Sequence, residues 1–268
     1  MKTISPASTN NSRIIGGCKC SSRQSSPGKK TPCITVDTPF EKPDLATYSQ
    51  DEQIGSGNIP TWNSPDILTN VTLPFKLLPE AEITVRNLSA TPASNALVHI
   101  FTSPFGIGTQ ETIQLSQLVN IGGGQQITLK YPWSQAILEG DQRVGIHIRI
   151  EHPYDEKLIN NFGSQVIDAA YTSVAGRNFS ILVPVVNNSA FNHTLQFQVL
   201  PTDINATLNA SSHVFAPFEQ INLALHSVVP NFLHGTPASP LQREITVVAR
   251  QTGGTIIGGT TLIIYIDN

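Results

Sequence analysis

The sequence has few charged residues and no excess of positive charge. Charged side chains are 13% of the 268 residues, against about 25% in an average protein. Sixteen lysines and arginines stand against nineteen aspartates and glutamates, which gives a formal net charge of −3. Binding to nucleic-acid phosphates needs a surplus of basic side chains. The composition therefore excludes a strongly basic nucleic-acid binder and a highly charged disordered protein.

Long apolar runs are also absent. A helix that spans a bilayer needs about 20 consecutive apolar residues, and the longest apolar stretches, residues 181–186 and 262–266, are the size of strands. The first twenty residues lack the apolar segment that a secretory signal requires. We therefore expect no membrane span, and a chain that is either cytoplasmic or exported without a cleaved leader.

Cysteine is scarce and confined to the start of the chain, at Cys18, Cys20 and Cys33. Three thiols, two of them separated by one residue, do not supply the usual four ligands of zinc, and an odd number forms no closed disulfide framework. We interpret them as free thiols; a metal site and an intermolecular disulfide remain as alternatives. Residues 1–60 are rich in proline, serine and threonine and show no periodicity. This composition predicts an extended or disordered N-terminal arm that orders only against a partner.

Catalytic and cofactor motifs are missing as well. The sequence contains no His-x-x-x-His, no phosphate-binding loop and no strand-linked Gly-x-Gly-x-x-Gly. Arg13 begins a string, Arg-Ile-Ile-Gly-Gly, that matches protease activation sites, but no Gly-Asp-Ser-Gly accompanies it. We therefore expect no enzyme, no cofactor, and no catalytic, cofactor-binding or metal-binding residue.

Two metal sites stay open as weaker alternatives. His99 and His147 could share an ion if their strands are neighbours, although His147 is more simply a surface imidazole that faces away from the apolar side of its strand. Asp155 and Glu156 could help to bind calcium between two domains, but calcium needs about six to eight oxygen ligands. The sequence shows no cluster of acidic residues that dense.

The sequence does contain many segments in which apolar and polar residues alternate. Alternation with β-branched residues is typical of half-buried antiparallel strands. In the first half, these segments are residues 80–87, 95–101, 125–131 and 143–152. Residues 111–119 fit either a short helix or an irregular strand, and residues 134–140 fit a single helical turn.

The second half repeats this plan. The segments with strand patterns are residues 165–171, 178–187, 193–200, 219–226, 243–250 and 255–266. The predicted fold class is all-β, with two tandem immunoglobulin-like antiparallel β-sandwiches at residues 61–155 and 156–268 after the N-terminal arm. No cysteine follows residue 33, so the two-sheet cores must supply the stability without a disulfide.

Three short motifs in the first predicted sandwich resemble a known module. Residues 64–67 are Ser-Pro-Asp-Ile, residues 82–89 are Glu-Ile-Thr-Val-Arg-Asn-Leu-Ser, and residues 148–163 end in Asn-Asn-Phe-Gly. Over about residues 62–165 the chain resembles the CARDB-like, cell-adhesion-related β-sandwich modules of bacterial proteins. The resemblance implies that the Pro-Asp-Ile motif opens the first strand and that Asn87 ends the second. Residues 166–268 resemble no family.

These features together predict a non-enzymatic structural or protein-interaction protein, an accessory or assembly component that has a protein partner or forms a homo-oligomer. Tandem sandwiches present loops and edge strands, and an arm can add a strand to a neighbour's sheet. The alternative is a carbohydrate or cell-surface polymer binding module, which would need an exposed row of aromatic side chains. The available candidates are Trp62, Tyr131, Trp133, Tyr154 and Tyr171.

Overall fold

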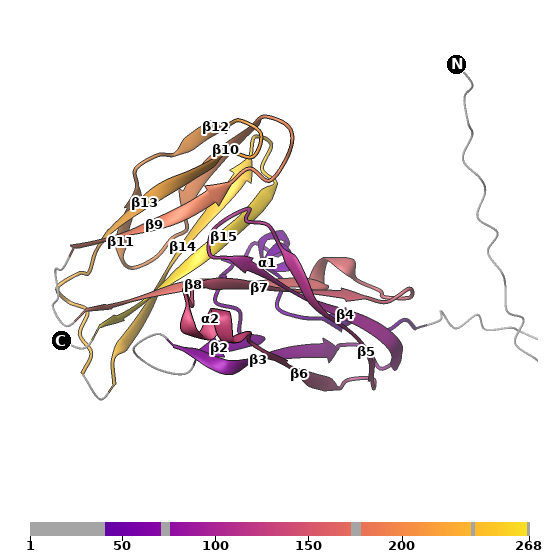
Figure 1. Ribbon diagram of the computed structural model, residues 1–268. Coiled ribbons are helices and arrows are strands. Elements are labelled where there is room, and N and C mark those ends of the chain that lie inside the picture. The colour runs from indigo at the N-terminus through magenta and orange to yellow at the C-terminus, as the bar shows by residue number, and fades with distance from the viewer. Residues whose placement is uncertain (1–40, 71–75, 173–177, 237–238, 267–268) are drawn as a thin grey trace, which may run out of the picture. The chain divides into compact units, whose positions relative to one another are not determined.

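Strands provide nearly all of the regular structure in the computed structural model, which describes residues 41–70, 76–172, 178–236 and 239–266 (Figure 1). Two short helices, α1 (Gln50–Gly55) and α2 (Gln135–Glu139), have six and five residues. The predicted all-β fold with immunoglobulin-like sandwiches is confirmed.

The first sandwich consists of two sheets packed face to face. In one sheet β3 is central and pairs with β1, β2 and β6; in the other, β4 lies between β5 and β7. Inward side chains of both sheets form a single apolar cluster that includes Ile83, Val85, Ile100 and Ile148. The strands are β1 (Leu45–Ala46), β2 (Ile67–Asn70), β3 (Leu77–Asn87), β4 (Ala93–Pro104), β5 (Thr112–Ile121), β6 (Gln126–Pro132) and β7 (Val144–Glu151).

The second sandwich has the same two-sheet plan. Its smaller sheet has β13 between β11 and β9, and the facing sheet has the order β12-β10-β14-β15. A second apolar cluster, with Phe215, Leu223 and Ile245 fully buried, lies between them. The strands are β9 (Asn178–Val186), β10 (His193–Val199), β11 (Asn205–Leu208), β12 (Ser212–Phe215), β13 (Gln220–Val228), β14 (Leu241–Gln251) and β15 (Ile256–Ile266).

One long strand, β8 (Phe162–Thr172), belongs to both sandwiches. Residues 162–166 pair antiparallel with β7, and residues 167–172 pair parallel with β15. As a result, one eight-stranded sheet runs from β12 to β5 through both halves of the chain (Figure 1). The two cores are distinct clusters, but the backbone hydrogen bonding between the two sandwiches is continuous.

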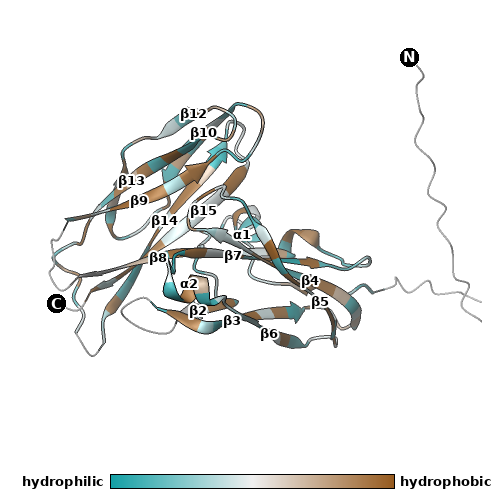
Figure 2. Cartoon of the chain, in the orientation of Figure 1, coloured by the Kyte–Doolittle hydropathy of each residue, from teal (hydrophilic) through white to brown (hydrophobic). Residues whose placement is uncertain are grey.

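Alternation along the strands explains why the cores form where they do. Figure 2 shows polar and apolar residues alternating along many strands. In β7, for example, Ile146, Ile148 and Ile150 are buried in the first core, while Arg149 and Glu151 are exposed. Because side chains point to opposite faces in turn, one face of each sheet is apolar and packs against its partner sheet.

Residues 41–60 differ from the arm that was predicted for residues 1–60. Leu45 is fully buried in the first core, and β1 pairs with the end of β3. Helix α1 begins at the cap Ser49, whose hydroxyl accepts from the amide of Glu52 and donates to the carbonyl of Ile159 at 2.7 Å. These elements are too short to produce a periodic pattern, so composition alone suggested an arm. Residues 1–40 lie outside the described part of the chain.

Two local predictions are resolved in the same sandwich. Residues 112–119 are part of a strand, β5, and not of a helix, whereas α2 forms within the predicted turn at residues 134–140. A 3₁₀ turn, η1 (Leu158–Asn160), precedes β8 and is separated from it by Asn161.

Candidate functional site

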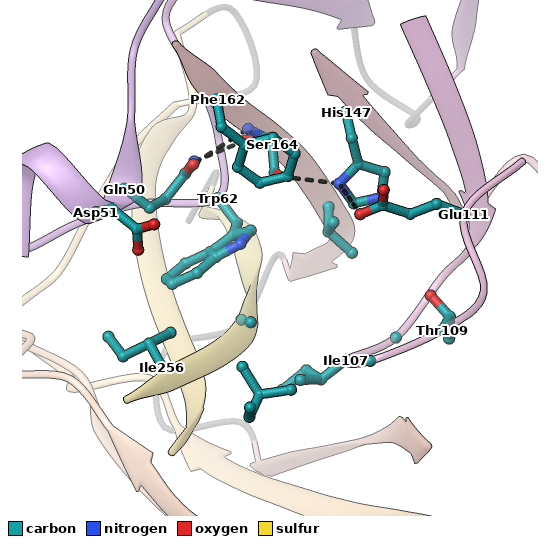
Figure 3. Close-up of a pocket in the computed structure, with 16 residues that line it drawn as sticks. Gln50, Asp51, Trp62, Ile107, Thr109, Glu111, His147, Phe162, Ser164 and Ile256 are labelled. Carbon is teal, nitrogen blue, oxygen red and sulfur yellow. Dashed lines mark hydrogen bonds and ion pairs between the residues drawn. The ribbon is translucent and has the colours of Figure 1, made fainter. Parts of the chain in front are cut away.

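A cavity of about 180 Å³ lies where the two sandwiches meet (Figure 3). Helix α1, the loop after β4, strands β7 and β8, and the start of β15 all contribute to its lining. Polar groups line one part and apolar groups the other. The side chains that define it are Gln50, Trp62, Ile107, Glu111, His147 and Ser164.

Trp62 forms one wall of the cavity and fixes the segment before β2 to the second sandwich. Its amide donates to the hydroxyl of Thr261 at 2.8 Å, and its carbonyl accepts from the amide of Val166 at 2.9 Å. Gly259 packs against the indole ring, because a Cβ at that position would lie 2.6 Å from it. On either side of Trp62, Thr61 and Asn63 bind the carboxylate of Glu244. The indole is therefore held in place and largely buried.

The loop after β4 forms the floor of the cavity and enters the second sandwich. Ile107 forms a parallel bridge with Val185 of β9, donates to the carbonyl of Pro184 and accepts from the amide of Val186, both at 2.9 Å. Its side chain belongs to the second core. Gly108 has a φ of +69°, and a Cβ there would lie 2.4 Å from the Val186 carbonyl. Only glycine permits so close an approach of the two backbones.

His147 lies at the polar end of the cavity and is buried, contrary to the prediction of a surface imidazole. Its Nδ1 lies 2.9 Å from the Ser164 hydroxyl and its Nε2 lies 3.0 Å from the Ser103 hydroxyl. Burial lowers the pKa of His147 from 6.5 to about 4, so the ring is neutral at neutral pH. With both ring nitrogens bound to hydroxyls, His147 orients the two serines and does not titrate near neutral pH.

Glu111 and Asp51 are the acidic residues in the lining of the cavity, and Glu111 is the one beside His147. Its carboxylate lies 3.6 Å from Nδ1 of His147. Burial raises the pKa of Glu111, while the nearby positive charge of Arg149 lowers it. At the opposite side Gln50 is saturated, since it donates to the carbonyls of Thr61 and Ser164 and accepts from the amide of Ser164. Most polar groups of the cavity therefore bind one another, and the Glu111 carboxylate is left as an acceptor for a small donor.

The proposed pairing of His99 and His147 around a metal is not favoured by their positions. Their strands are neighbours, but His99 lies opposite Arg149 and His147 lies opposite Phe101. The guanidinium of Arg149 stacks over the Phe101 ring at 5.2 Å. Within the described residues, no three histidine, cysteine or acidic side chains are placed to hold a metal ion. Cys18, Cys20 and Cys33 lie outside that part of the chain.

Asp155 organises a loop and is saturated with protein donors. It accepts from the amides of Leu45 and Lys157 and from the side-chain amide of Asn161. Burial raises the pKa of Asp155, and these hydrogen bonds lower it. The adjacent Glu156 donates its amide to the carbonyl of Pro43. Asp155 thus connects the N-terminal segment to the end of β7 and has a structural role in this loop.

The aromatic residues considered for carbohydrate binding do not form an exposed row among the described residues. Trp62, Tyr131 and Trp133 are buried, and the last two pack edge to face at 5.4 Å. Tyr154 is exposed and stands apart, next to His152. The side chain of Tyr171 lies outside the described residues.

Sequence reasoning missed a corner that occurs once in each sandwich. Asn87, which ends β3, donates to the carbonyls of Thr91 and Ile121 and accepts from Ser89. Asn187, which follows β9, donates to the carbonyls of Phe191 and Ala216 and accepts from Ser189. The string Asn-x-Ser-Ala at residues 87–90 and 187–190 was the signal that could have shown it. We refer to residues 87–91 together with Gly124 as the first corner, and to residues 187–191 together with Phe218 as the second corner, because the amides of Gly124 and Phe218 donate to the carbonyls of Ser89 and Ser189.

The second corner carries two exposed aromatic side chains. Phe191 is 74% exposed and Phe218, whose amide donates to the carbonyl of Ser189, is 66% exposed. Phe218 has a φ of +58°, which is unusual for a bulky residue. In the first corner, the equivalent positions are Thr91 and Gly124, and Gly124 has a φ of +67°. The second sandwich thus has phenylalanine in a backbone position where the first has glycine.

Comparisons with known proteins assign no family. No protein-family model and no curated protein matches the chain. Solved structures similar to it include the ASH/PapD-like domain 7 of human CEP192, with 8% identity, a TM-score of 0.28, and coverage of 37% of this chain and 80% of that one. Elastase-activated α-2-macroglobulin of Escherichia coli has 8% identity and a TM-score of 0.28 over 84% of this chain, which spans 22% of that protein. CBD12 of CALX1.2 has 12% identity and a TM-score of 0.23 over 70% of this chain and 93% of its own.

Among the described residues, no helix has the length and apolar character needed to cross a bilayer.

Proposed function

We propose that the chain is a non-enzymatic protein-interaction protein that acts as a structural or accessory component of an assembly. The observation that most supports this function is the aromatic pair of the second corner, Phe191 and Phe218. Both residues are joined by hydrogen bonds to the same turn, at Asn187 and Ser189, and large exposed aromatic side chains are typical of contact sites between proteins. The left-handed backbone of Phe218 strengthens the argument, because a bulky residue there costs stability and gains no packing in return.

A rigid pairing of the two sandwiches fits the same function. The shared strand β8, the insertion of Ile107 and the packing of Trp62 fix the second sandwich, and with it the second corner, to the first sandwich. A binding surface on a rigid scaffold loses little conformational entropy when a partner binds. The protein would therefore present its aromatic pair in a defined direction.

We further propose that the first sandwich is a CARDB-like module of a bacterial protein. Its support is the Asn87 corner, where the side chain of the asparagine closes the turn between β3 and β4. Serine at position 89 donates its hydroxyl to both Asn87 Oδ1 and the Thr91 carbonyl. Ser89 therefore supports the turn in the place where such modules commonly have a glycine.

The experiment is quantitative co-purification of the full chain from its source, with a corner-swap variant beside it. The variant Phe191→Thr with Phe218→Gly gives the second corner the residues of the first. We expect a partner protein to be retained by the wild type and reduced at least tenfold with the variant. The matched control, Val214→Ser on the exposed face of β12, should retain the partner. Equal retention by all three proteins would contradict the proposed contact site.

A further inference from the structure

The described sheets have several free edges, and all but one are short or blocked. β1, β2, β11 and β12 have two to four residues. β9 contains Pro184 and is bridged by Ile107, and β6 contains Lys130 and Pro132. Short length, proline, lysine and covering loops are the usual means by which proteins keep sheet edges from pairing with other chains.

β5 is the exception. It forms one end of the eight-stranded sheet and has ten residues, and within the described part of the chain it pairs only with β4. Its sequence, Thr-Ile-Gln-Leu-Ser-Gln-Leu-Val-Asn-Ile, contains no charged residue and no proline. An uncharged edge of this length leaves a row of backbone groups available to an additional strand.

Two exposed apolar side chains lie on the outward face of β5, which also carries the polar Ser116 and Asn120. Leu118 is 62% exposed and lies opposite Leu97 of β4, and the exposed Ile113 lies opposite Phe101. Of the inward side chains, Val119 belongs to the first core and Leu115 packs against it, whereas Gln117, opposite Val98, is exposed. An added strand would therefore cover Leu118 in addition to pairing with the backbone.

We infer that β5 pairs antiparallel with β5 of a second copy of this chain, with Leu118 opposite Leu118 on a two-fold axis. This inference rests on the proposed function, of which it specifies one partner. In an antiparallel pair, directly opposed residues point to the same face of the sheet. This register places Leu118 of both copies on the outward face. Ser116 then faces Asn120, and Gln117 faces Val119, with the inward side chains of both copies on the core side.

A second copy fits this edge because the strand complements itself. Like charges directly opposite each other destabilise a strand pair, and β5 has none to oppose. The two-fold axis places the exposed Leu118 of one copy against Leu118 of the other, so both side chains are removed from water. Two-fold contacts in which the same patch serves both subunits are the commonest form of homo-oligomer.

The first test is the mass of the full chain in solution, by light scattering and sedimentation across a concentration series. We expect a dimer, with a dissociation constant raised at least tenfold by Leu118→Lys. The side chain is exposed, so circular dichroism should show an unchanged fold. Val214→Lys, an equivalent substitution on the opposite edge strand β12, should leave the dimer intact.

The second test is disulfide trapping. Leu118→Cys is introduced into a chain whose Cys18, Cys20 and Cys33 are serine. Opposed Cα atoms in an antiparallel pair are about 4.5–5.5 Å apart, which suits a disulfide. We expect a covalent dimer with Leu118→Cys and none with Ile113→Cys, since the two copies of residue 113 would be far apart.

Three results would overturn the inference: a monomer at all concentrations, a dimer that Leu118→Lys leaves unchanged, or equal trapping at positions 113 and 118. A dimer that is lost when the three native cysteines are replaced would also overturn it. None of these results bears on capture of a partner by the second corner. The proposed function and the β5 contact can therefore fail separately.

Discussion

The two corners have the same hydrogen bonds and present different surfaces. In each, a buried asparagine joins two carbonyls and a serine, and a left-handed residue donates to the serine carbonyl. The first corner has a half-buried Thr91 and an exposed Gly124, and the second has the exposed Phe191 and Phe218. The comparison shows that the turn depends on the buried asparagine, which leaves the outward positions free to serve binding.

The largest expected effect is a loss of stability when the side chain that the first sandwich contributes to the second core is made polar. Ile107 comes from the first sandwich but is buried in the second core. Ile107→Asp should lower the free energy of unfolding by at least about 4 kcal/mol, because it buries an unpaired charge. Hydrogen exchange should show the loss mainly in β9 and its neighbours. Leu158→Asp, at an exposed position, serves as the control and should change little.

The second-largest expected effect is a dependence of stability on pH, which arises from His147 of β7, at the border between the two sandwiches. The pKa of His147 is lowered to about 4 in the folded protein, from 6.5. Between these values the unfolded chain holds a proton that the folded chain does not, so stability falls as the pH falls from 7 to 4. The shift corresponds to roughly 3 kcal/mol.

Denaturant unfolding at several pH values measures the His147 effect. Its control is His147→Gln, which should lose this dependence on pH while keeping the contribution of opposite sign from Glu111, whose pKa is raised. A wild-type protein and a His147→Gln variant with the same pH profile would contradict the assignment of a buried neutral imidazole.

A smaller effect tests whether the two corners are equivalent. Asn87→Ala and Asn187→Ala each remove a buried side chain that donates to two carbonyls of its corner, so each should cost about 2 kcal/mol. Asn87 also accepts from the amide of Asp44 at 3.4 Å, which has no counterpart at Asn187. Chemical denaturation should therefore show the larger loss for Asn87→Ala. If only one of the two variants loses stability, the two corners share their geometry but do not contribute equally to the free energy of unfolding.

The smallest effect separates backbone strain from binding. Phe218→Gly should raise the free energy of unfolding by about 1 kcal/mol, because it removes a left-handed phenylalanine that is largely exposed. Gly124→Ala should lower it by a similar amount; an added Cβ there meets nothing within 4 Å, so only the backbone is affected. Thermal unfolding of both variants measures the pair. Two changes of the same sign would contradict the strain argument.

The sequence predicted the strands far better than their partners. Residues 143–152 alternate in the sequence, and β7 forms there with three isoleucines in the core. Nothing in a local pattern could show that β8 would pair with β7 and then, in parallel, with β15, because paired residues of β8 and β15, such as Ile167 and Thr261, are 94 positions apart in the chain. Alternation defines a face, and pairing depends on the whole fold.

The candidate site could not be predicted from the sequence, because it too depends on contacts between segments that are far apart in the chain. His147 was placed correctly on the face away from the apolar residues of its strand. That face is covered by residues from α1, the loop after β4 and β15, so the imidazole is buried. The short β1 and α1 within residues 41–60 have no detectable period, and a local signal for them exists only in the cap Ser49.

The shared strand β8 has a mechanical consequence. A linker between domains gives them a hinge, but here the chain passes from one sandwich to the other without leaving the sheet. A tensile load between the two halves would act along this strand and would stress its hydrogen bonds to β7 and β15 in shear, several at a time. The two modules would then resist stretching as a single element and would transmit an applied force without bending at their border.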